Sequence, residues 1–460
     1  MGKNRDFGVI LSSFLKCSIG AASFGLPYAL SKAGYVSGSL SIAVMGLVSY
    51  YTMLLMVHSK EMIQDNFLLL SLPLLPPTPR DDDKTGRLKS KSQSVSGDRG
   101  SVSASFDHIS KGGGLFIYSM LGEGAWGKNG RLVSEIAVFL LLVGIGAGYM
   151  VFISTNFSSA LKDLNYNLPA VWKVVVVPVI PCLLSLLRTY DGLSRVAGLG
   201  IFCVAAALII IFTFGPLESS FQDIGDLDAA NLSELPGVLG VSAFLLAIQP
   251  AVMSFAEETD DKAVLKSALK WGCGIVVVMN IALAVFGYFL WGSSTNPYIF
   301  CNIESEGLVI ATKFLLVIEL MCSLPLALRP NIEMLEKAMG LEAGGPWQTE
   351  LKRNVVRVGI ALLSYVLTVG IPVFNDLLTL TGGVCGSAVG FVLPPLVHAS
   401  LLKKFGEDEL MGYSSQSERL RAIALDYALA TVGIGIMGWT LYGSLQVLMN
   451  GSEDGAGSDC

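Results

Sequence analysis

Apolar residues occur in blocks of about 20 along almost the whole chain, the length that a helix needs to cross roughly 30 Å of hydrocarbon. Of the 460 residues, 52% are hydrophobic and only 15% are charged, against about 25% in a typical soluble domain. The sequence therefore predicts an all-α membrane protein without a soluble catalytic domain. We expect 11 spans, at residues 7–30, 34–57, 132–157, 169–188, 192–214, 236–257, 267–291, 307–329, 354–373, 376–400 and 422–449.

These spans predict the organisation of the chain. We expect helices 1–2 in residues 1–57, a cytoplasmic loop in 58–131, helices 3–5 in 132–214, an acidic extracytoplasmic loop in 215–235, helices 6–10 in 236–400, a cytoplasmic loop in 401–421, helix 11 in 422–449 and an extracytoplasmic tail in 450–460. The lead before the first span is too short for a signal peptide, so we expect that span to be retained. Residues 76–111 are rich in serine and charge and are predicted to be disordered, as a linker, a phosphorylated segment or a lipid-headgroup contact.

The positive charges predict the orientation. If the first span starts in the cytoplasm, 26 of the 31 Lys and Arg residues fall on the cytoplasmic side. The 215–235 loop on the other side carries acidic residues, no Lys or Arg, and the sequon Asn231-Leu232-Ser233. We therefore expect a cytoplasmic N-terminus, an extracytoplasmic C-terminus and Asn231 as a candidate glycosylation site.

The middle of the first span is a poor helix. Gly20 and Gly25 lie within Gly20-Ala21-Ala22-Ser23-Phe24-Gly25, and Pro27 lies two residues beyond Gly25. Glycine and proline weaken helical hydrogen bonding, and free backbone groups at membrane depth are tolerated where they line a cavity or are buried in protein. A broken first helix is therefore a candidate binding site.

The sixth span is also interrupted. Pro250, preceded by the polar Gln249, predicts a break near Ala247–Ala251. The two breaks open two sets of five spans of opposite orientation, and broken helices at corresponding positions of inverted repeats are typical of transporter binding sites. Helix N-termini would receive a carboxylate, and exposed carbonyls an ammonium group or a cation. The alternative is that both breaks are ordinary membrane-helix kinks.

The first-span sequence SFLKCSIGAASFGLPYALSKAGYVSG resembles the motif of the amino acid/auxin permease family, within the amino acid–polyamine–organocation superfamily. Supporting patterns are Ser323-Leu324-Pro325 with Arg329-Pro330, and Tyr118–Gly127 with Gly148-Tyr149. The resemblance covers residues 7–57 and 115–450 and is greatest to vacuolar and proton-coupled amino acid transporters. It implies a LeuT-like five-plus-five inverted repeat with an eleventh helix, and amino acid transport coupled to H⁺ or Na⁺.

The resemblance also implies site residues. Substrate would be bound by the broken segments, at Ser18, Gly20, Ala21, Ala22, Ser23, Gly25, Ala247, Gln249 and Ala251. Ser323 lies where sodium-coupled relatives place a hydroxyl ligand, so Na⁺ would bind Ser323 and the backbone of Gly20; alternatively, this hydroxyl bonds to the carbonyl four residues earlier. Proton-coupled relatives carry a first-span histidine where this chain has Ser13, which argues against a histidine relay at that position.

Charged and aromatic residues inside spans give further candidates. Lys16 and Glu319 are predicted to take part in ion coupling, because charges inside the bilayer are costly and burial favours the neutral form of a carboxyl group. Lys16 reaching the cytoplasmic surface and Glu319 in a structural pair are the alternatives. Tyr149 would cover the substrate or pack as an aromatic residue. The three histidines and eight cysteines are expected to be structural or solvated.

Together these features predict secondary active transport of neutral amino acids by alternating access, with H⁺ or Na⁺ as coupling ion and no cofactor. An amino-acid sensor of the same fold is the main alternative. A passive channel is a weaker form of the transport hypothesis, and an intramembrane enzyme is disfavoured because neither HExxH nor GxSxG occurs. Expected partners are the amino acid and the bilayer, without nucleic acid. The membrane, vacuolar/lysosomal or plasma membrane, and the oligomeric state stay open.

Overall fold

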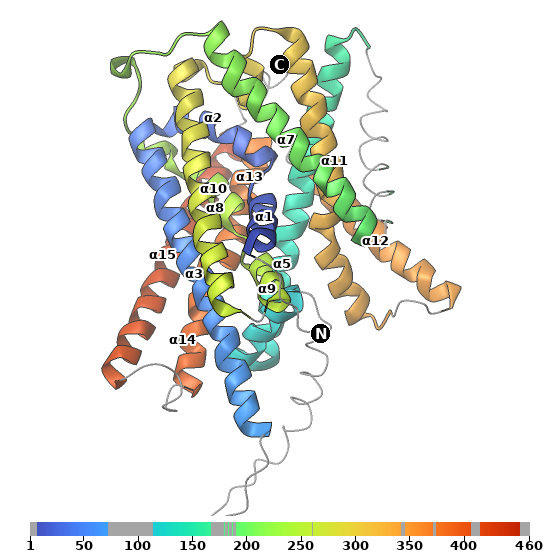
Figure 1. Cartoon of the computed structure of the whole chain (residues 1–460), viewed down its shortest axis with the longest axis vertical. Helices are drawn as coiled ribbons and strands as arrows, with labels where there is room; N and C mark the ends of the chain where they lie inside the picture. Colours follow the sequence, from blue (N-terminus) through green and yellow to red (C-terminus); the bar gives the residue numbers. More distant parts are fainter. Residues whose placement is uncertain are drawn as a thin grey trace, which may run out of the picture.

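The computed structural model describes residues 7–71, 114–166, 190–259, 261–341, 346–370, 374–405 and 415–450, together with positions 179, 183 and 186. The elements of this part of the chain are helices (Figure 1). Eight of them are long and apolar enough to cross a membrane, and a ninth span follows if a bent pair is counted as one. The predicted all-helical membrane class is confirmed, whereas the count of 11 spans is not.

The predicted first span consists of α1 (Phe7–Ser18), the 3₁₀ helix η1 (Ala21–Gly25) and α2 (Leu26–Ala33). The segment before Gly20 and the segment after it are bent by 49°. The predicted sixth span consists of α8 (Leu235–Leu246) and α9 (Gln249–Glu258), with two non-helical residues between them. Both predicted breaks are therefore confirmed.

The other long helices correspond to predicted spans. They are α3 (Tyr35–Ser71), α5 (Gly114–Asp163), α7 (Tyr190–Glu218), α10 (Lys262–Trp291), α11 (Glu306–Ala338), α12 (Trp347–Gly370), α14 (Leu393–Phe405) and α15 (Gln416–Asn450). Short α13 (Phe374–Leu380) and the π-helical η6 (Thr381–Gly386) and η7 (Ala388–Val392) precede α14. The predicted ninth span is α12, which is helical but is not among the eight, and the predicted fourth span, 169–188, lies almost wholly outside the described residues.

The ends of the predicted 58–131 loop are helical. α3 continues to Ser71, and α5 begins at Gly114 with a break at Trp126 and Gly127, where Gly127 has a φ of 67°. Glycine is suited to this left-handed conformation. Residues 76–111, predicted to be disordered, lie outside the described residues.

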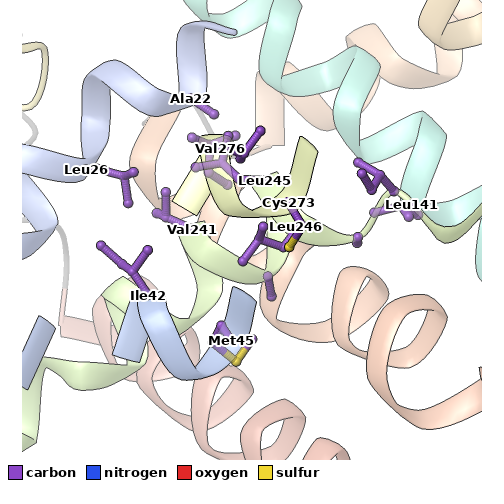
Figure 2. Packing of buried hydrophobic residues seen from close by; sticks show 14 of the residues in the cluster. Ala22, Leu26, Ile42, Met45, Leu141, Val241, Leu245, Leu246, Cys273 and Val276 are labelled. Atoms are coloured by element: carbon purple, nitrogen blue, oxygen red, sulfur yellow. The ribbon is translucent and has the colours of Figure 1, made fainter. Parts of the chain in front are cut away.

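The long helices pack around the two broken spans. α10 packs against α1, α2 and α3, while α8 packs against α2 and α3. On the other side of the bundle α11 packs against α5 and α7, and α12 packs against α5 (Figure 1). Figure 2 shows the apolar core where these groups meet, with Ala22 and Leu26 gathered near Val241 and Leu245 of α8. This core positions the broken segments.

The two ends of the bundle differ in charge. In Figure 1 the C-terminal end of α3, the end of α14 and the start of α15 lie at the lower end, and the ends of α14 and α15 there carry the basic residues Lys403, Lys404, Arg419 and Arg421. The acidic connection between α7 and α8 lies at the upper end and is tied to the turn between α2 and α3, since Tyr35 N–H donates to Asp228 O at 3.1 Å. The described part of the fold thus separates these basic helix ends from the acidic connection.

Candidate functional site

The break in the first span is centred on Gly20. This residue is extended, with φ −162° and ψ −168°, and begins η1 without a side-chain cap. A Cβ atom at Gly20 would meet no other atom within 4 Å, so there is open space beside the break. Backbone N–H groups at the start of a helix lack intrahelical partners, and they carry the positive end of the helix dipole. The start of η1 can therefore receive an anionic group.

The side chains predicted to line this break are mostly buried. Ser18 donates its hydroxyl to Phe14 O of its own helix, at 3.1 Å. Ala21, Ala22, Ser23 and Gly25 are buried, and the Ser23 hydroxyl has no hydrogen-bond partner among the described residues. A buried polar atom without a partner is uncommon in native proteins and suggests a ligand or water partner.

The break in the sixth span lies at Ala247 and Ile248, whose ψ angles of 53° and 9° end α8. Pro250 lies in the first turn of α9, where its missing N–H costs no helical bond. The start of α9 also has no side-chain cap. Each broken span therefore offers an uncapped helix start, the feature expected at a site for a carboxylate.

Gln249 fastens this second break to α3. Its fully buried amide donates to Thr52 Oγ1 at 3.1 Å and to Ser49 Oγ at 3.4 Å. Ser49 in turn donates to Leu246 O, at 2.7 Å, which satisfies a carbonyl at the end of α8. The amide nitrogen of Gln249 is thus directed to α3, and its contact with substrate stays a prediction, as does that of Ala251.

The candidate ion-coupling residues lie together. Ser323 donates to Glu319 Oε1 at 2.8 Å, and the charges of Glu319 and Lys16 interact. Glu319 is only 5% exposed, and its Oε2 has no hydrogen-bond partner among the described residues. Lys16 lies in the last turn of α1, where a cation complements the negative end of the helix dipole. Two interactions therefore favour the position of Lys16 at the break: its attraction to Glu319 and its attraction to the negative end of the α1 dipole.

These residues could hold a small cation. Oxygen ligands suit a hard ion, and the cluster offers the Ser323 hydroxyl and the Glu319 carboxylate. Among the alternatives for Ser323, the structure shows a bond to the side chain four residues earlier rather than to its carbonyl. Coordination by the Gly20 backbone stays a prediction.

Tyr149 lies on α5 and packs against both the main apolar core and a second, smaller cluster of buried apolar side chains. Its hydroxyl interacts electrostatically with Glu319 and Cys17. The side chain thus borders the ion cluster and the end of α1, and its role over the substrate stays a prediction.

Two buried polar clusters were not identified from the sequence. One joins His58, His398 and Asp426 on α3, α14 and α15. The other joins Lys313, which is 0% exposed, to Asp163 Oδ2 at 2.6 Å and to Ser159 Oγ at 2.9 Å. In the sequence, the charged residues Asp426 and Lys313 within apolar segments indicate such clusters, because charged groups inside membrane spans are usually paired.

Ion pairs and a disulfide fix the ends of several helices. Burial opposes the charge of Arg353, but hydrogen bonds and charges of Glu336 and Glu350 outweigh it and raise the pKa of Arg353. Arg357 donates to Glu336 at 3.0 Å, so this network joins α11 to α12.

Burial raises the pKa of Tyr298, whose hydroxyl lies 3.4 Å from Thr155 Oγ1. Cys301 is disulfide-bonded, which the sequence analysis did not predict.

The π-helical turns η6 and η7 are a third irregularity beside the site. A Cβ at Gly382 would collide with Gly240 O and the backbone of Phe244, so the absence of a side chain permits close packing on α8. π-Helical turns are rare and frequently occur at functional sites. The glycines of Thr381–Val392 were the signal in the sequence.

Asn231 is half-buried in the acidic connection. Its Oδ1 accepts a hydrogen bond from Ser233 Oγ at 2.6 Å, and its N–H donates to Ala33 O at 2.7 Å. Glycosylation of Asn231 stays a prediction.

Comparison with protein families gives a match over most of the chain. The model of the transmembrane amino acid transporter protein family matches residues 10–67 and 102–446. Amino acid transporter AVT3A of Arabidopsis thaliana is 24% identical over 395 residues, which is 84% of this chain and 79% of the relative.

More distant relatives carry different names. Vacuolar amino acid transporter 3 of Schizosaccharomyces pombe is 18% identical, over 95% of this chain and 58% of the relative. Sodium-coupled neutral amino acid symporter 2 of Danio rerio is 19% identical, over 64% of this chain and 65% of the relative. Among solved structures, the crystal structure of MhsT in complex with L-phenylalanine matches with a TM-score of 0.47 and 14% identity, over 94% of this chain and 98% of that chain.

Proposed function

The chain belongs to the transmembrane amino acid transporter family, whose members are membrane transporters and not enzymes, and from this premise we propose that it is a secondary active transporter of neutral amino acids. An H⁺ or Na⁺ gradient would drive the cycle by alternating access. The predicted five-plus-five repeat fits this cycle, because each broken span divides into two half-helices.

The observation that supports the proposal best is the pair of uncapped helix starts at Gly20 and Gln249. An amino acid carries a carboxylate, which accepts hydrogen bonds from free N–H groups and is stabilised by the positive ends of helix dipoles. Carbonyls at the ends of α1 and α8 would receive its ammonium group. The open space at Gly20 offers room for the backbone of the substrate.

A neutral side chain suits the residues around the breaks. Ala21 and Ala22 in the first span and Ala247 in the sixth are small, apolar and buried. A charged substrate side chain would lose its hydration among these apolar residues. Ser23, whose hydroxyl has no hydrogen-bond partner among the described residues, is the polar contact that we assign to the substrate.

Coupling would use Lys16, Glu319 and Ser323. In a proton-coupled cycle Glu319 exchanges a proton, and its attraction to Lys16 changes with its charge. In a sodium-coupled cycle Ser323 and Glu319 bind the ion. One relative is named as a sodium-coupled symporter, which supports Na⁺ as an alternative to H⁺.

We also propose that the basic end of the bundle faces the cytoplasm. Positive charge favours the cytoplasmic side, and the disulfide of Cys301 fits the opposite side, because disulfides are rare in the cytosol. A relative named as a vacuolar amino acid transporter supports a vacuolar membrane.

The test is uptake of labelled amino acids into proteoliposomes, with Na⁺ and H⁺ gradients imposed separately. We expect one gradient to drive accumulation of neutral amino acids above equilibrium. Saturable binding without flux would replace the proposal by the sensor hypothesis, and flux without accumulation would indicate a passive channel.

A further inference from the structure

Three helices far apart in the sequence meet at a buried chain of titratable groups. His398 Nδ1 on α14 lies 2.6 Å from Asp426 Oδ2 on α15, and His398 Nε2 lies 2.9 Å from His58 Nδ1 on α3. His398 is 1% and Asp426 0% exposed, whereas His58 is half-buried. We call these residues the histidine cluster. They form a continuous path of hydrogen-bonding atoms from a buried carboxylate towards the surface.

We propose that the histidine cluster is a proton-binding site, distinct from the Lys16–Glu319–Ser323 cluster, and that its occupancy is transmitted along α3 to the break in the sixth span.

The buried carboxylate gives the cluster its affinity for a proton. With both histidines neutral, the cluster carries the uncompensated charge of Asp426, whose Oδ1 has no hydrogen-bond partner among the described residues. An unpaired buried charge is costly, and one added proton on the imidazoles makes the cluster neutral overall. His398 then donates from both ring nitrogens, to Asp426 and to His58, without moving either partner.

A second added proton has the opposite effect. Both nitrogens of the His58–His398 contact would then carry hydrogen, so that two donors face each other across 2.9 Å. The contact cannot persist in that state, and α3 would separate from α14 at this point. The cluster is therefore stable with one added proton and opened by two.

The other charged groups around the histidine cluster do not change the number of added protons at which it is neutral or at which it opens. Glu61 interacts with His58, but it is paired with Lys262 and Lys266 of α10, at 3.6 and 3.9 Å, and these lysines also interact with His58. The nearby lysines of α3 and α14 are directed elsewhere, Lys60 to Ala256 O, Lys403 to the Tyr427 hydroxyl and Lys404 to Gly124 O. His398 is the group that interacts with Asp426 in the described part of the chain.

α3 links the cluster to the sixth span. Along α3, Ser49 bonds to Leu246 O at the end of α8, and Thr52 accepts a bond from Gln249 at the start of α9. Lys60 donates to Ala256 O near the end of α9, at 2.6 Å. His58 lies between Thr52 and Lys60 on the same helix, so a displacement of α3 at His58 acts directly on both contacts with α9.

The two candidate ion sites lie on different helices. Glu319 and Ser323 belong to α11, which in Figure 1 lies across the bundle from α14 and α15. A change at the histidine cluster can therefore be separated experimentally from a change at Glu319.

The direct test is histidine NMR on the full-length protein in nanodiscs. The chain has three histidines, so ¹⁵N-histidine labelling gives three ring systems, and His108→Gln identifies the one outside the cluster. We expect the ring ¹⁵N signals of His58 and His398 to change together as the pH is varied, because the two rings are in direct contact, and Asp426→Asn to alter this joint change, because it removes the buried carboxylate. In His58→Gln, a substitution at the half-buried position, His398 should titrate in a single step. Independent titration of both histidines near pH 6.5, unchanged by Asp426→Asn, would overturn the proposal.

The link to the sixth span rests on the proposed transport function and needs its own measurement. We expect His58→Gln and Asp426→Asn to change the pH profile of amino acid flux in proteoliposomes, while His108→Gln keeps the wild-type profile. Coupled titration with unchanged flux profiles would refute the transmission along α3 and leave the proton site. A protein without any flux would refute the transport function, and the NMR titration would still decide the proton site.

Discussion

Substitution of Gly20 by alanine tests whether the open space at the first break is used by the substrate. Gly20 is extended, a conformation that alanine adopts without strain, and its Cβ would meet nothing within 4 Å. By restricting the unfolded chain, the change should stabilise the fold by about 0.4–1 kcal/mol. If the substrate occupies this space, a methyl group there should cost about 1–3 kcal/mol of binding, roughly a 10- to 200-fold loss in uptake efficiency. Stability and transport should therefore move in opposite directions.

The assay combines thermal unfolding of the purified variant with saturation of uptake in proteoliposomes. Gly274→Ala on α10 is the matched control, because Gly274 is exposed, a Cβ there also meets nothing within 4 Å, and the change should only raise helix stability by up to about 1 kcal/mol. Normal uptake by a stable Gly20→Ala protein would show that this space is not part of the substrate site. A lowered melting temperature would contradict the open geometry itself.

Three further changes test the site and its support. Gly25→Leu places a large side chain at a buried position of the first break and should abolish flux while surface expression persists; full flux would remove the broken-helix hypothesis. Glu319→Gln cannot exchange a proton and should alter the pH dependence of flux, whereas an unchanged profile would leave Glu319 with a structural role. Asp163→Asn leaves the fully buried Lys313 without its carboxylate and should destabilise the protein by about 3–5 kcal/mol in denaturant unfolding. The double variant with Lys313→Met should recover most of this loss; equal stability of Asp163→Asn and wild type would show that the ion pair contributes little.

The sequence was sufficient for features that a few neighbouring residues decide. Two glycines and small side chains predicted the break at Gly20, and Pro250 predicted the one at Ala247–Ile248, because local backbone preferences dominate where the helix cannot complete its hydrogen bonds. The boundaries of α3 and α5 were less predictable. Both helices continue through short polar segments, residues 58–61 of α3 and 127–131 of α5, where hydropathy predicts an end to the span.

Contacts between distant segments could not be derived in this way. The family resemblance placed Gln249 among the substrate-binding residues, but its amide nitrogen bonds to Ser49 and Thr52, about 200 positions away in the chain. His58 and His398 were interpreted separately as structural or solvated residues, although they are 340 positions apart and in direct contact. Which buried polar groups meet depends on how helices pack, and a single sequence does not encode that packing in any local pattern.

The contacts of α3 explain why a proton at the histidine cluster would act on transport. α9 is fastened to α3 near both of its ends, by Gln249 and by the carbonyl of Ala256, so α3 and α9 should move as one unit. His58 joins the same helix to α14 through His398. A movement of α9 relative to α14 during alternating access must then break or strain the histidine contact, and the free energy of that contact enters the conformational equilibrium. Each pH unit changes the free energy of binding one proton by about 1.4 kcal/mol, which is enough to shift such an equilibrium tenfold.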